Sequence, residues 1–196
     1  MRSGFQSSPY RLTFKMFAQY QIFDYPYAPK LNPRLYRIVV DNNNGAPVQG
    51  GAFRTHRDLH TRGLKDVDVL FIWIKQLLPQ CARNFAEQDF LQLSDANIGL
   101  GGRGGFKPDS FKIDGCWGIH YNKGQKAGKH NHFPYTMTFV YCVNAPDKSS
   151  PLIIEGERIT PVPGRVIFFL GHQYHGTLPS KVDGRCMIVG NVLYAP

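Results

Sequence analysis

Short apolar runs, separated by turn residues, make up the C-terminal half of the chain. The runs are CWGIHY from residue 116, TMTFVYCV from 136, LII from 152, VIFFL from 166 and CMIVGNVL from 186. Glycine, proline and aspartate lie between them, with no helical pattern in between. Short strands at regular spacing predict an antiparallel sandwich or barrel.

An apolar stripe with the period of a helix precedes these strands. Its members recur at i, i+3, i+4 and i+7: Val67, Leu70, Phe71, Ile74, Leu77, Leu78 and Cys81. We expect a helix that opens at Asp66 and covers the outer face of the sandwich. Pro79 is expected to kink or end it near Leu78.

Asn32-Pro33 indicates the start of an earlier helix, with asparagine as the cap and proline at the first helical position. Residues 49–63 (QGGAFRTHRDLHTRG) are polar and predict a loop. His56 and His60 are four residues apart in this loop. Because no apolar periodicity supports a helix there, we do not interpret them as metal ligands.

Residues 1–30 are rich in aromatic side chains and are interrupted by prolines. This composition favours an extended arm or edge strand that packs over the domain itself or over a neighbouring subunit, as in a homo-oligomer. We expect one domain over residues 1–196. In it, the arm (1–30) and a helical and loop support (31–115) precede the core strands that carry the site (116–196).

Composition narrows the class of protein. The chain has 196 residues, of which 42% are hydrophobic and 13% aromatic, as in a globular domain. It contains no apolar run of membrane-spanning length and no apolar centre of a secretory signal, so we expect a cytoplasmic protein with no membrane partner. The net charge of +9 is dispersed and no nucleic-acid motif is present, which favours a generally basic surface. The four cysteines lack C-x-x-C spacing and are expected to be reduced and buried.

Three histidines and one arginine carry the candidate chemistry. His130 and His132 are two residues apart, so in an extended segment both side chains lie on one face. His175 lies between two apolar runs, and strand pairing would bring it to the first two. Three protein ligands leave coordination positions free, as in catalytic metal sites, but imidazole alone does not distinguish iron, zinc, copper and nickel. Arg185 begins the next apolar run and is suited to gripping the carboxylate of an acidic co-substrate.

Three further features of the sequence bear on this set of residues. His172 competes with His175 for the third ligand position, since the two are three residues apart. His120 alternates with Tyr121 and is expected to face the other way. The glycines between 99 and 105 lack the G-K-[ST] of a phosphate-binding loop and fit a loop that covers the substrate.

Taken in order, these residues resemble the 2-oxoglutarate and Fe(II)-dependent oxygenases. The resemblance is to the prolyl-hydroxylase-like branch and to short oxygenases of bacteria and phages. It runs through Trp117, Tyr121, Gly124, His130-Asn131-His132, Thr138, Val140-Tyr141, Pro163-Gly164, Phe168-Phe169, His175, Pro179, Gly184-Arg185 and Asn191.

The resemblance implies a mostly β fold, a double-stranded β-helix (jelly roll, cupin-like) with N-terminal helices packed on the sheet. It also implies a dioxygenase that hydroxylates an unidentified substrate, with a protein side chain such as prolyl as the expectation by analogy. In that case His130, His132 and His175 bind Fe(II), Arg185 holds the distal carboxylate of 2-oxoglutarate, and Tyr121 or Thr138 hydrogen-bonds this co-substrate.

His132 departs from the usual family pattern, in which aspartate or glutamate holds this position. Two alternatives therefore stay open. One is a structural or assembly protein, of a phage particle for example, that keeps the fold without the activity and is located in the virion or the host cytoplasm. The other is a three-histidine iron or zinc enzyme that does not use 2-oxoglutarate.

Overall fold

The computed structural model describes residues 19–45, 47–87 and 110–195. The strands are β1 (Tyr20–Asp24), β2 (Phe53–Arg54), β3 (Phe111–Tyr121), β4 (Met137–Asn144), β5 (Leu152–Ile154), β6 (Glu157–Ile159), β7 (Arg165–Leu170), β8 (His175–Thr177) and β9 (Arg185–Tyr194). The helices are α1 (Ala28–Asp41), α2 (Lys65–Glu87) and a short 3-10 helix, η1 (Leu59–Thr61).

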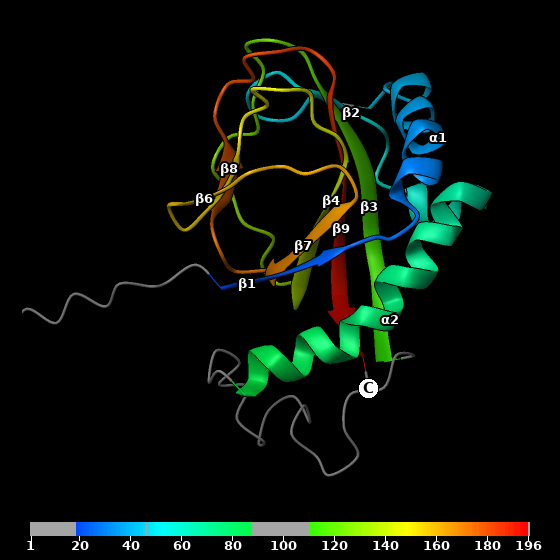
Figure 1. Ribbon diagram of the computed structural model, residues 1–196. Coiled ribbons are helices and arrows are strands. Elements are labelled where there is room, and N and C mark those ends of the chain that lie inside the picture. Colours follow the sequence, from blue (N-terminus) through cyan, green and yellow to red (C-terminus); the bar gives the residue numbers. More distant parts are fainter. Residues whose placement is uncertain (1–18, 46, 88–109, 196) are drawn as a thin grey trace, which may run out of the picture.

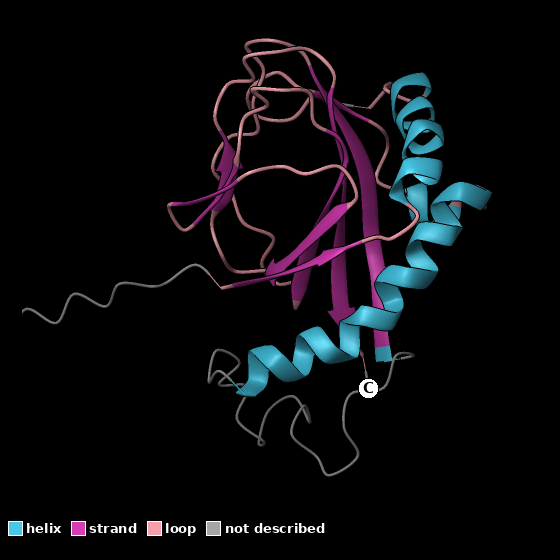
Figure 2. Cartoon of the chain, viewed as in Figure 1, coloured by secondary structure: helices cyan, strands magenta, loops and turns pink. Residues whose placement is uncertain are grey.

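The strands form two antiparallel sheets that face each other. The larger has the order β1-β7-β4-β9-β3-β2 and the smaller the order β6-β5-β8. The two helices lie on one side of the larger sheet, and β6 and β8 lie on the other (Figures 1 and 2). The structure is the predicted double-stranded β-helix, with the helices packed on the sheet.

Alternation along each strand of the large sheet creates two separate cores. Met137, Phe139 and Tyr141 of β4 belong to the cluster that includes the buried residues of both helices. Val140 and Cys142 of the same strand belong to a second cluster, between the two sheets. Because successive side chains of a strand point to opposite faces, one apolar run fills both cores.

Helix α1 begins at Ala28, four residues before the predicted Asn32 cap. Pro29 lies in its first turn, where a missing N–H costs nothing, and Pro33 lies inside the helix. The buried Asn32 amide donates to the Val143 carbonyl (2.8 Å) and accepts a hydrogen bond from the Tyr141 hydroxyl (2.7 Å). The predicted cap was wrong because these long-range partners hold the amide.

Helix α2 follows the predicted apolar stripe but does not end at Pro79. It begins at Lys65 and continues to Glu87. Beyond the proline, Cys81, Ala82 and Phe85 are buried in the core between helix and sheet. Burial of these side chains offsets a proline penalty of about 3 kcal/mol.

Part of the predicted N-terminal arm is an edge strand. β1 pairs with β7, and Arg165 donates two hydrogen bonds to Asp24 at 2.9 and 3.2 Å. The arm residues 1–18 and the glycine-rich segment 99–105 lie outside the described residues. All four cysteines are free and buried, as predicted. Within the described parts of the chain, no helix has the length and apolar character needed to cross a membrane.

Candidate metal centre

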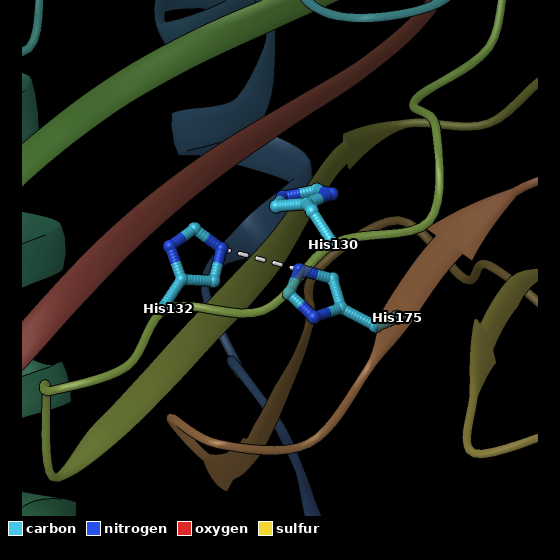
Figure 3. Close-up of side chains that lie close together, drawn as sticks. All are labelled: His130, His132 and His175. Carbon is cyan, nitrogen blue, oxygen red and sulfur yellow. Dashed lines mark hydrogen bonds between the residues drawn. The ribbon is translucent and has the colours of Figure 1, made fainter.

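Backbone pairing brings the three histidines together from two distant segments. His130 and His132 lie between β3 and β4, and His175 begins β8 (Figure 3). The His130 N–H donates to the His175 carbonyl at 2.9 Å, and the His175 N–H donates back to the His130 carbonyl at 2.8 Å. The His132 N–H donates to the Gly171 carbonyl at 2.7 Å. The strand pairing that was expected to bring His175 to the other two histidines is therefore present.

The three imidazoles are arranged to hold one metal ion. Their candidate ligand nitrogens lie within 4.8 Å of one another, and Nε2 of His132 is 3.2 Å from Nε2 of His175. Two nitrogens bound to one ion at about 2.1 Å and at right angles would be about 3 Å apart. The closest pair already has this separation. Figure 3 shows the three rings close together, with a nitrogen of His132 facing a nitrogen of His175.

Backbone carbonyls orient two of the rings. The Nδ1–H of His130 donates to the Gly128 carbonyl at 2.7 Å, and the Nδ1–H of His175 donates to the Gln173 carbonyl at 3.2 Å. A carbonyl only accepts, so Nδ1 carries the proton and each Nε2 keeps its lone pair for a metal. This is the usual outer-sphere support of a metal-binding histidine.

Burial keeps two of the histidines uncharged. Loss of hydration lowers the pKa of His132 to about 3, and the neighbouring histidines and Arg57 act in the same direction. Burial likewise lowers the pKa of His175 to about 3, with His130 adding to the effect. Neutral imidazole is the form that binds metals, so the environment prepares these ligands at neutral pH.

Arg185 lies in the same cavity and has unpaired donors. It is 1% exposed, and its Nε and Nη1 atoms have no hydrogen-bond partner among the described residues. Its guanidinium carbon is 4.5 Å from the centre of the Tyr121 ring, which is opposite it in the pairing of β3 with β9. A buried guanidinium without an anion is costly, so the arrangement fits a bound carboxylate.

Tyr121 and Thr138 both lie on the face of the sheet between the two layers, but only Tyr121 lines the cavity. Burial raises the pKa of the Tyr121 hydroxyl, which is therefore a protonated donor at neutral pH. Thr138 is opposite Asn191 in the register of β4 with β9. The Thr138 hydroxyl and the side-chain oxygen Oδ1 of Asn191 are buried, and neither has a hydrogen-bond partner among the described residues.

The cavity has a volume of ≈ 280 Å³ and is lined by the three histidines, Arg185, Tyr121 and Trp117, among others. Apolar side chains of the cluster between the two sheets complete the wall of this cavity. His172, the competitor for the third ligand position, is exposed and is not part of the histidine cluster. His120 faces the helices as predicted, where its ring is 3.0 Å from the Tyr36 hydroxyl.

Two arginines of this cavity, Arg54 and Arg57, were missed by the sequence analysis. They fall in residues 49–63, which were predicted to be a loop. Arg54 ends the two-residue strand β2, which pairs with β3, and Arg57 follows three residues later. The alternation of Phe53 and Arg54 was too short a signal to identify a strand.

Several solved structures share this fold. A prolyl-4-hydroxylase from Pseudomonas putida matches with a TM-score of 0.57 and 16% identity, covering 90% of this chain and 93% of that chain. The viral collagen prolyl hydroxylase of Paramecium bursaria Chlorella virus-1, in its 2-oxoglutarate complex, matches with a TM-score of 0.58 and 14% identity over 88% and 94%. The non-haem α-ketoglutarate-dependent epimerase SnoN from nogalamycin biosynthesis matches with a TM-score of 0.56 and 10% identity over 91% and 81%.

No protein-family model matches the chain, and neither does any curated protein. The structural similarity shows that the chain has the fold of the 2-oxoglutarate and Fe(II)-dependent oxygenases, with prolyl hydroxylases among its neighbours. It thereby confirms the fold that the sequence resemblance implied.

Proposed function

We propose that the protein is a non-haem Fe(II)- and 2-oxoglutarate-dependent dioxygenase that hydroxylates a C–H bond of its substrate. One observation carries the proposal. The buried guanidinium of Arg185, with unpaired Nε and Nη1, shares a cavity with three histidines that converge as metal ligands. A co-substrate that chelates the metal at one end and carries a carboxylate at the other satisfies both features.

The chemistry of the donor set fits Fe(II). Three neutral nitrogens occupy one side of an ion and leave the other side open for a chelating co-substrate and for oxygen. His132 stands where a carboxylate is usual in the family, so the centre is one charge more positive. This extra charge favours a dianionic co-substrate.

The remaining cavity residues fit 2-oxoglutarate. Arg185 would receive its distal carboxylate in a two-pronged grip, and this grip would satisfy the orphaned donors. Tyr121, beside Arg185, would donate its hydroxyl hydrogen to the same carboxylate. Thr138 does not line the cavity, so the co-substrate would have to reach beyond the cavity wall to accept a hydrogen bond from it. Tyr121 does line the cavity and is therefore the better supported of the two donors.

When bound, iron and 2-oxoglutarate supply an oxidative decarboxylation: 2-oxoglutarate, dioxygen and R–H give succinate, carbon dioxide and R–OH. The chain's own residues provide position and shelter. Gly128 and Gln173 fix the ring orientations of His130 and His175 through their carbonyls. The apolar wall formed by Ile119, Val140, Leu152, Met187 and Val189 excludes water from the reacting groups.

The substrate class suggested by the structural neighbours is a protein side chain. Two of them are named as prolyl hydroxylases, one acting on collagen. In a three-histidine enzyme that ignores 2-oxoglutarate, Arg185 would have to serve another anion, whereas 2-oxoglutarate satisfies the metal and the unpaired donors of Arg185 with one molecule.

An anaerobic titration tests the proposal. Metal-stripped protein receives Fe(II) and then 2-oxoglutarate, and the visible charge-transfer band of the chelate is recorded. We expect a band that requires both additions, is absent in His130→Ala and is weakened in Arg185→Ala. The exposed Arg158 on β6 gives a matched control, because Arg158→Ala should leave the band unchanged. Iron binding without a band would overturn the role of 2-oxoglutarate, and no iron binding would overturn the metal centre.

A further inference from the structure

The metal cavity is lined by basic side chains and by no acidic one. Its described lining contains three arginines, Arg54, Arg57 and Arg185, and neither aspartate nor glutamate. Arg185 lies at the buried end, whereas Arg54 is half-buried and Arg57 exposed. The two missed arginines therefore lie toward the solvent side of the cavity, where a substrate would enter.

The fold directs both arginines to the site. Arg54 is opposite Ile119 in the pairing of β2 with β3, and paired residues share a face, so its side chain lies on the cavity side. The guanidinium carbon of Arg57 is 4.7 Å from the centre of the Trp117 ring. The centre of that ring is in turn 5.7 Å from the His132 ring. The Trp117 ring thus lies between Arg57 and the candidate metal ligand His132.

Neither Arg54 nor Arg57 forms an ion pair with an acidic side chain of the described residues. The ion pairs found among the described residues involve Arg34, Arg62 and Arg165, not Arg54 or Arg57. Asp58, the acid beside Arg57 in sequence, pairs with Arg62 at 3.6 Å. Burial and the charge of Arg57 lower the pKa of Arg54, which agrees with two like charges held near each other without an anion.

The proposed co-substrate does not balance this charge. A dianion offsets a divalent metal, the histidines are neutral, and Arg185 engages a carboxylate of the same dianion. The guanidinium charges of Arg54 and Arg57 remain at the mouth, and His132 contributes no negative charge where a carboxylate ligand would. A cavity with this field attracts anions and repels cations.

We propose that the substrate of this site carries an oxyanion group, a carboxylate or a phosphate, which Arg54 and Arg57 bind at the mouth of the cavity. Two guanidinium forks suit such a group because each can donate two parallel hydrogen bonds to it. This inference rests on the proposed function for the identity of the site, but the anion position itself requires only the two arginines. The oxyanion would hold the C–H bond of the substrate on the metal side of Trp117.

Trp117 provides a direct reporter of binding at this position. The chain has two tryptophans, Trp73 and Trp117, so Trp73→Phe leaves only the one under Arg57. This variant, with Fe(II) and 2-oxoglutarate under anaerobic conditions, is titrated at constant ionic strength with acetate, inorganic phosphate or acetamide. Acetamide is the uncharged counterpart of acetate. Fluorescence and titration calorimetry are recorded together, so that binding without an optical change is also detected.

We expect saturable binding of acetate or phosphate and no binding of acetamide, and the tighter of the two anions indicates the group on the substrate. Arg54→Gln and Arg57→Gln should each weaken binding about fivefold or more, because each removes a charge-assisted hydrogen bond. Arg158→Gln should have no effect. Equal responses to acetate and acetamide, no binding of either anion, or binding that ignores both substitutions would overturn the proposal.

The visible iron and 2-oxoglutarate band, recorded in the same samples, separates the two proposals. A band without arginine-dependent anion binding refutes the anion position and leaves the proposed function intact. The titration is repeated on metal-free protein. Arginine-dependent binding there, in a protein that forms no band, refutes the proposed function and retains the anion position.

Discussion

Replacing Arg185 with methionine is expected to stabilise the free protein and to weaken its binding of 2-oxoglutarate. The two effects have opposite signs because the guanidinium is 1% exposed and its Nε and Nη1 have no partner in the described structure. Without an anion it is a buried, incompletely satisfied charge. With one it becomes the main receptor for the co-substrate.

The change in the free energy of unfolding is estimated from the loss of the buried Arg185 guanidinium. Substitution of a buried ionic group by an apolar side chain of similar volume is often neutral or stabilising by about 1–4 kcal/mol. Loss of the buried cation–π contact with Tyr121, worth about 2 kcal/mol, reduces this gain. We therefore expect the free protein to gain up to about 2 kcal/mol, with each kcal/mol raising the melting temperature by about 2–4 °C.

The loss on the ligand side is larger. A hydrogen bond to a charged group contributes about 1.5–3 kcal/mol, and the bidentate grip supplies two. Because the two are not additive, we expect 2-oxoglutarate binding to weaken by about 2–4 kcal/mol, a factor of about 30 to 1000. Arg185→Lys keeps the charge but not the planar fork, so it should fall between wild type and Arg185→Met.

Thermal unfolding measures both effects in one assay. Melting temperatures are recorded for metal-loaded, anaerobic protein with and without 2-oxoglutarate, because a ligand that binds only the folded state raises them by mass action. Arg158→Met, at an exposed position on β6, controls for loss of positive charge. If Arg185→Met melts several degrees lower than wild type and still shows the full shift with 2-oxoglutarate, the guanidinium is structural and the assignment is wrong.

Three further outcomes are expected. His130→Ala should abolish metal binding, measured by metal content after dialysis, while the circular dichroism spectrum stays that of the wild type, since the ring lines an open cavity. Metal-free protein should lose stability as the pH falls from 6.5 toward 3, because the unfolded chain then binds protons that His132 and His175, with pKa values of about 3, do not. Urea unfolding should show a loss of about 2 kcal/mol for each histidine at pH 5, and a flat stability profile would contradict the burial argument. Gly190→Ala should destabilise the protein by about 1–3 kcal/mol in the same assay, because the added methyl group would overlap the ring of Phe139; unchanged stability would mean that this contact relaxes freely.

Local periodicity was enough to predict five of the nine described strands and the apolar stripe of the long helix. The five apolar runs correspond to β3, β4, β5, β7 and β9, and the i, i+3, i+4 stripe corresponds to α2. The errors came where distant partners outweighed a local rule. Asn32 is held by Val143 and Tyr141 and does not cap α1, and the core beyond Pro79 keeps α2 helical.

The sequence by itself determined which side chains could form a metal centre. A spacing of two residues places His130 and His132 on one side of an extended segment, and an isolated arginine at the start of a buried strand indicates an anion. These are properties of residue type and short-range geometry. They are the same in any fold that keeps the segments extended.

Only the tertiary structure decided which groups share a cavity and in what state. The backbone pairing of residue 130 with residue 175 selects His175 over His172, since the exposed His172 lies in the turn that precedes β8. Burial, a property of the whole packed molecule, lowers the pKa of two candidate ligands, and it leaves Nε and Nη1 of Arg185 without a hydrogen-bond partner among the described residues. Arg54 reaches the site through the register of a two-residue strand. Contacts between residues so far apart in sequence depend on the packing of the entire chain, which no local pattern encodes.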